Sequence, residues 1–166
     1  ALYMNVFRNL SVPRASRSPL AEGGLLRAVA KALPTAGQKN LLVTMSCVVV
    51  ANALIQNNHH RAEMLANEPD ALSNIATVAL GKTPGVTPDG KQLMVVSVGP
   101  DGQHDLRVQY EAGRLVAELC QWEEFARVLW PLGVKDVFQL MLESKFQVLK
   151  DEAQKALDSV SKFGLQ

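Results

Sequence analysis

The feature that most constrains the fold is a repeating unit of three helices, short, medium and long, which recurs roughly every 40 residues once residues 81–105 are set aside. Segments 20–26 and 129–135 occupy the same place in two copies, since each ends a short helix, turns at glycine and opens a medium helix. Long helices then begin near Gln38 and Gln147, and a third begins near Gln109. One such unit cannot bury its apolar face alone, so we expect stacked units that share a continuous core.

Apolar residues at spacings of three and four predict where the helices lie, and proline and glycine separate them. Residues 13–19 are expected to form a turn with a short helical start, and Pro34 is expected to end a helix. The predicted helices are 1–12, 20–33, 38–56, 59–65, 71–80, 106–122, 123–130, 134–142 and 146–163. The core should be aliphatic because aromatic residues make up only 5% of the chain; it is predicted to include Leu41, Leu42, Met45, Leu115, Leu119, Ala156 and Val160.

Residues 81–105 differ in kind from the rest of the chain. They hold three prolines and two Asp-Gly pairs, and the latter are turn signals. The apolar run 93–96 between these pairs can be a strand of a short hairpin. We favour the other interpretation, an insertion loop whose apolar residues pack onto neighbouring helices.

Charge and cysteine content exclude several classes of function. The net charge of +1 gives no electrostatic basis for nucleic-acid binding. Cys47 and Cys120 lie in apolar helical patterns without metal-ligand spacing, so we expect neither a disulfide nor a metal site, and a reducing, cytoplasmic compartment. The near-apolar run 41–55 is too short to span a bilayer and is expected to be a buried helix, without integral membrane contact.

No catalytic constellation is visible, so no catalytic residue, cofactor or enzymatic activity is expected. His59 and His60 lack a carboxylate or cysteine at ligand spacing, which favours a polar loop between helices over a metal site or a general base. Ser97 and Ser161 have no nucleophile motif around them. Gly81-Lys82-Thr83 is similar to the end of a phosphate-binding loop, but Ala76 stands where that motif requires glycine.

Three segments, 7–12, 21–26 and 110–119, resemble armadillo repeats, and the last is similar to the long third helix of that family. The resemblance covers nearly the whole chain apart from 81–105. It implies an all-α, armadillo-like superhelical solenoid of about three to four repeats. Residues 1–166 would then form one armadillo-like domain, a section of a longer array, with 81–105 as an insertion loop.

Within this superfamily, the order of segments 8–13, 38–44, 133–135 and 152–157 is most similar to the smg-type GDP-dissociation stimulators. That resemblance implies a protein-binding scaffold, an exchange or chaperone factor for small GTPases of the Rho and Rap type, which are often prenylated. The partner would bind on the concave face, and no nucleic acid would be bound. The alternative is a generic armadillo or HEAT adaptor in trafficking or protein assembly.

In armadillo arrays the long third helices line the concave face, and this resemblance selects the candidate site. Aligning the apolar patterns puts Asn9, Cys47, Glu118 and Ser159 at one position, so the asparagine ladder that binds linear peptides in the importin manner is broken. Charged residues nearby can form a patch or, alternatively, a solvated helix face with pairs such as Glu111–Arg114, and Asn9 can equally serve a helix end. The predicted partner-binding residues are Asn9, Asn40, Cys47, Glu111, Arg114, Glu118, Glu152 and Ser159.

Overall fold

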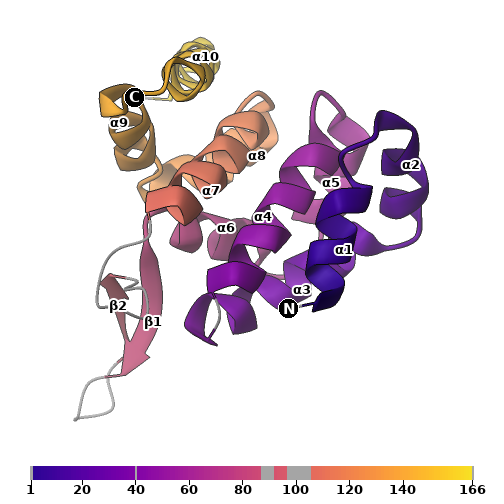
Figure 1. Cartoon of the computed structure of the whole chain (residues 1–166). Coiled ribbons are helices and arrows are strands. Elements are labelled where there is room, and N and C mark those ends of the chain that lie inside the picture. Colours follow the sequence, from indigo (N-terminus) through magenta and orange to yellow (C-terminus); the bar gives the residue numbers. More distant parts are fainter. Residues whose placement is uncertain (1, 40, 87–91, 97–105, 166) are drawn as a thin grey trace.

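The structure, a computed structural model, describes residues 2–39, 41–86, 92–96 and 106–165, and these residues are mostly helical (Figure 1). The described part contains ten α-helices, one short 3-10 helix (Trp130–Leu132) and a two-stranded hairpin. The helices are α1 (Leu2–Leu10), α2 (Arg14–Glu22), α3 (Leu25–Lys39), α4 (Leu41–Ile55), α5 (His59–Ala66), α6 (Ala71–Ala79), α7 (Leu106–Leu119), α8 (Glu123–Leu129), α9 (Lys135–Glu143) and α10 (Gln147–Lys162).

Every third helix belongs to one row. Helices α1, α4, α7 and α10 lie side by side in that order, and each packs against the next (Figure 1). We call these four the row helices. Three of the row helices pack against the helix that precedes them in the chain: α4 against α3, α7 against α6, and α10 against α9. The short helices α2, α5 and α8 begin the three units. The predicted order of short, medium and long helices is therefore present in α5–α7 and α8–α10, whereas α3 and α4 have equal lengths of 15 residues.

A residue in the left-handed backbone conformation stands between the first and second helix of each unit. Gly24 has a φ of 85° and Gly133 a φ of 87°, as the two aligned glycine segments predicted. In the middle unit this position is held by Asp70, whose φ is 60° and which the sequence pattern did not reveal. Aspartate is one of the few residues other than glycine that tolerate this conformation. The three units therefore share one turn geometry.

Two predictions about proline were wrong. Helix α3 continues through Pro34 to Lys39, and most of residues 13–19, predicted as a turn with a short helical start, belong to α2, which runs to Glu22 with Pro19 inside it. An internal proline removes one backbone hydrogen bond from the helix. In α3 the buried face formed by Leu26, Val29 and Leu33 stabilises the helix enough to offset that loss.

The segment after α6 is a hairpin and not the irregular loop that we favoured. Strand β1 (Lys82–Val86) pairs antiparallel with β2 (Gln92–Val96), with Pro84 opposite Met94. The hairpin projects from the helical body beside α7, and β1 contacts α6 and α3 (Figure 1). Residues 87–91 and 97–105 lie outside the described part of the chain.

The core is continuous through all three units and is mainly aliphatic, as predicted. Leu115, Leu119, Ala156 and Val160 are buried as predicted, whereas Met45 is half-buried and is not part of the core cluster, so its assignment to the core was wrong. The side chains of the predicted core residues Leu41 and Leu42 lie outside what the structure describes. Cys47 and Cys120 are free, fully buried thiols, and burial raises their pKa to about 11 and about 12 respectively.

The shared turn geometry gives a test with a matched control. A Cβ at Gly133 would meet no atom within 4 Å, so Gly133→Ala introduces backbone strain and no clash. We expect it to lower the free energy of unfolding by about 1–2 kcal/mol. Asp70→Gly, at the same position of the preceding unit, should leave stability unchanged or raise it. Urea unfolding of both variants measures this, and a Gly133→Ala protein as stable as wild type would contradict the assignment.

Candidate functional site

A groove runs across the exposed faces of three row helices, α4, α7 and α10. Its volume is about 310 Å³. We call it the row groove, and it is lined by Val49, Asn52, Ala53, Gln56, Asn57, Glu111, Arg114, Ala117, Glu118, Gln121, Glu152 and Lys155. Three glutamates stand against one arginine and one lysine in this lining, so the groove carries one excess negative charge.

Helical spacing explains why these residues share one face. On α4, Asn52 and Ala53 stand three and four residues after Val49, and Gln56, just past the helix end, stands four residues after Asn52, which places them on one side of the helix. Leu54 and its neighbours on the other side are fully buried. The buried side packs on α3, so the polar side is held outward.

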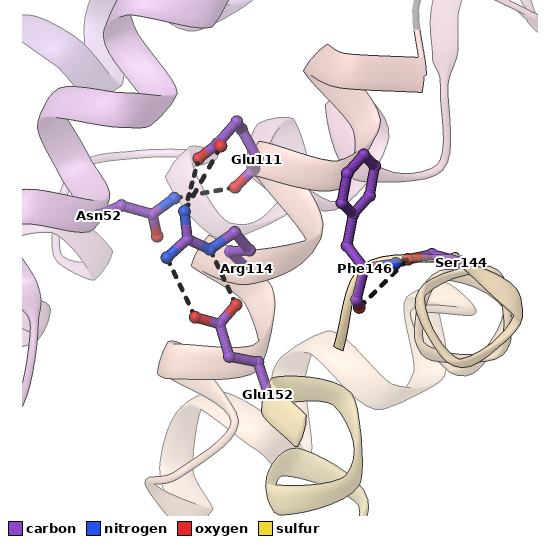
Figure 2. Close-up of polar contacts among 6 residues, drawn as sticks. All are labelled: Asn52, Glu111, Arg114, Ser144, Phe146 and Glu152. Atoms are coloured by element: carbon purple, nitrogen blue, oxygen red, sulfur yellow. Dashed lines mark hydrogen bonds and ion pairs between the residues drawn. The ribbon is translucent and has the colours of Figure 1, made fainter. Parts of the chain in front are cut away.

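Arg114 lies at the centre of the groove and joins α7 to α10. Its Nε and Nη2 atoms donate to the two carboxylate oxygens of Glu152 at 2.8 and 3.0 Å, and its Nη1 atom lies 3.3 Å from Glu111 Oε2 (Figure 2). The hydrogen bond with Glu152 is the main cause that raises the pKa of Arg114. Asn52 of α4 adds a third helix to this cluster, because its amide donates to the backbone oxygen of Glu111 at 2.9 Å. The predicted pair Glu111–Arg114 is thus part of a network that spans the three row helices.

The other polar groups of the groove are also held in place. A carboxylate oxygen of Glu118 accepts the backbone N–H of Asn57 at 2.6 Å, which ties α7 to the turn after α4. Asn57 is in the left-handed conformation, with a φ of 52°. The hydroxyl of Ser159 donates to Gln121 at 3.3 Å, so Ser159 lies at the edge of the groove on α10.

Beyond Arg114 the groove becomes apolar. A second hollow of about 600 Å³ shares Glu111 and Arg114 with the row groove. Its other lining residues are the apolar Met45, Tyr110, Phe146, Val148 and Leu149 and the polar Arg107, Lys145 and Gln147. Phe146 is 53% exposed, and the loop before α10 fixes it, since its backbone N–H donates to the Ser144 hydroxyl at 3.0 Å (Figure 2). The structure therefore offers an exposed aromatic ring beside a charged cluster.

The structure brings together five of the eight sequence-predicted residues. Glu111, Arg114, Glu118 and Glu152 line the row groove, and Ser159 contacts it through Gln121. Cys47 does not reach the groove: its side chain is fully buried on the opposite side of α4, so its assignment to the binding face was wrong. Asn9 is exposed near the end of α1 but does not line the groove, and Asn40 lies outside the described residues.

Sequence reasoning missed Asn52 and Gln56. The signal was available, because Asn52 interrupts the apolar second half of α4 and Gln56 follows it at a four-residue spacing just past the helix end, which marks the exposed face. The alignment of the apolar patterns selected a groove residue on α7, Glu118, but on α4 it selected Cys47, which lies on the buried face.

His59 joins two units outside the groove. Its Nε2 atom contacts Glu124 of α8, its Nδ1 lies 3.8 Å from Glu63, and its ring stacks on Phe125 with centroids 5.8 Å apart. The hydrogen bond with Glu124 raises the pKa of His59 and lowers that of Glu124. The predicted polar loop is thus a contact between the short helices α5 and α8.

This contact gives a pH-dependent prediction. Because folding raises the pKa of His59, its contribution to stability is fully present below the unfolded value of 6.5 and is lost as the pH rises through the folded value. His59→Gln should therefore destabilise the protein more at about pH 5.5 than at about pH 9. Thermal unfolding of both proteins at the two values measures the difference. If His59→Gln lowered the melting temperature equally at both pH values, the ion pair would be contradicted. In a Glu124→Gln background, His59→Gln should lower the melting temperature less at the acidic pH.

Within the described residues, no group of three or more histidine, cysteine, aspartate or glutamate side chains is arranged to hold a metal ion. The described segments contain no helix that combines the length and the apolar character needed to span a bilayer. In comparisons with known proteins, no family model matches the chain, and no curated protein matches it either. The fold and the site define a helical protein whose row helices present a charged groove, and this groove adjoins a largely apolar hollow with cations at its border.

Proposed function

We propose that this chain is a section of an armadillo-type solenoid that binds a partner protein in the row groove, and that it acts by binding and not by catalysis. The observation that carries the proposal is the unbroken row of α1, α4, α7 and α10, with polar groups from three neighbouring helices facing one groove. The repeated turn geometry at Gly24, Asp70 and Gly133 supports the reading of the helices as three units of one array.

The partner that we propose is a small GTPase of the Rho or Rap type, and the role is that of an exchange or chaperone factor. This rests on the resemblance to the smg-type stimulators. Exchange activity would follow if the groove bound the nucleotide-free GTPase more tightly than the nucleotide-bound form, because a binding protein shifts an equilibrium only by its differential affinity. The excess negative charge of the groove favours a partner segment with basic residues.

Glu118 allows a test of this charge complementarity without a change of shape. Glu118→Gln removes the negative charge but keeps an oxygen that can accept the Asn57 N–H. Binding of the GTPase should become about two- to tenfold weaker at low ionic strength and less affected at high salt, with an unchanged melting temperature. Titration against a panel of Rho-type and Rap-type GTPases measures this.

The matched control is Glu143→Gln, which removes one negative charge from α9 outside the groove. It should leave binding unchanged. Equal binding by wild type and Glu118→Gln at both salt concentrations would exclude the row groove as the site of contact. If no GTPase of the panel binds wild type, the GTPase assignment is wrong and the adaptor alternative takes its place.

A further inference from the structure

Three arginines converge on a separate pocket where the first unit meets the second. This pocket, of about 290 Å³, is lined by Arg14 and Arg17 of α2, Gln56 and Asn57 at the end of α4, and Arg61 of α5. No acidic side chain belongs to its lining. We call it the arginine pocket.

Neutral oxygen atoms hold two of the three guanidinium groups in position. Arg17 donates to the backbone oxygens of Ser11 and Val12 at 3.1 and 3.2 Å, and to Gln56 Oε1 at 3.2 Å. Arg61 donates to the backbone oxygen of Leu54 at 3.1 Å and to the Ser18 hydroxyl. These acceptors fix the side chains without neutralising them, and each guanidinium has five N–H donors, so several remain for a ligand.

Among the described residues, nothing neutralises the charge of the pocket. No described carboxylate forms an ion pair with Arg14, Arg17 or Arg61. By contrast, Arg27 is paired with Glu68, Arg114 with two glutamates, and Arg127 with Glu123. Helix α2 begins at Arg14 with no acidic residue in its first turn and no side-chain cap, so the positive end of its dipole adds to the same potential.

The arginine pocket is continuous with the row groove. Gln56 and Asn57 line both, so a chain segment that lies across α7 and α4 can reach the arginines with its next residues. The guanidinium fork matches carboxylate and phosphate oxygens, which it binds through paired hydrogen bonds.

We propose that the arginine pocket binds an acidic side chain, a carboxylate or a phosphate monoester, of the partner protein whose segment occupies the row groove. This specifies the partner more closely and rests on the proposed function. The segment would have opposite polarity along its length: basic or neutral residues opposite Glu118, and an anionic group at the end that lies over α2.

The test uses the whole chain and simple probes that need no identified partner. Hexaglutamate, hexaglutamine and inorganic phosphate are titrated while the arginine Nε–H signals are followed by NMR. Hexaglutamate and phosphate should shift the signals of the arginine pocket, and hexaglutamine should not. Arg14→Gln should weaken hexaglutamate binding about tenfold, because this arginine contributes charge and has no side-chain hydrogen bond to lose among the described residues.

Arg8→Gln is the matched control, since it removes the same charge from α1 outside the pocket and should leave binding unchanged. Equal weakening by both variants would mean attraction to overall charge and would overturn the proposal. The proposal would also be overturned if the protein bound vesicles of phosphatidylserine and phosphatidylcholine more tightly than hexaglutamate, and if Arg14→Gln abolished this vesicle binding. The two proposals fail separately: a GTPase that binds Arg14→Gln as tightly as wild type overturns this one alone, whereas hexaglutamate binding without any GTPase binding overturns only the GTPase assignment.

Discussion

The packing of each row helix against the helix before it is the interaction on which the rest of the structure depends. On α7, Ala112, Leu115 and Leu119 are fully buried against the core formed with α6 and α9. Glu111 and Arg114 each directly precede one of these buried residues and are three positions apart, so they share a different face of the helix, which is directed into the groove. Because α4 and α10 obey the same constraint and flank α7, their polar faces adjoin, and the groove is a consequence of how the core is buried.

Charge along the groove follows from which arginines have partners. In the middle, Arg114 is neutralised by Glu111 and Glu152, and the cluster holds α7 and α10 together at the surface. At the α2 end, Arg17 and Arg61 donate only to neutral oxygens, and Arg14 has no hydrogen-bond acceptor among the described residues. The half-buried, bidentate pair of Arg114 with Glu152 serves to join two helices, whereas unpaired, positioned cations are suited to binding an anion.

Much of the helical order could be predicted from spacing, proline and glycine, because these report local backbone preferences. Gly24 and Gly133 identified two turns, but the same turn at Asp70 was hidden, since aspartate adopts many other conformations. Pro34 was misleading because tertiary packing of α3 outweighs the lost hydrogen bond. The pairing of β1 with β2 depends on contacts between strands, which the apolar run alone did not decide.

The residues of the site could be predicted from the sequence only where they lie on one face of a single helix. Glu111, Arg114 and Glu118 follow one helical face of α7 and were found from the sequence. The arginine pocket unites α2 with Arg61, far along the chain, and no local pattern connects them. Cys47 was misplaced because the alignment followed the apolar residues and did not use Asn52 and Gln56, which mark the exposed face of α4 and the residue after it.

The central claim is that a partner protein lies in the row groove, and site-specific cross-linking tests it most directly. Both native thiols are buried and unreactive, so an introduced cysteine is the only one that a thiol-reactive photo-cross-linker should label. Lys155→Cys places the label in the groove on α10, and Ser161→Cys places it on the same helix outside the lining. We predict cross-links to the bound GTPase from position 155 and none from position 161. Cross-links from 161 alone, or none from 155 while the GTPase is bound, would contradict the account.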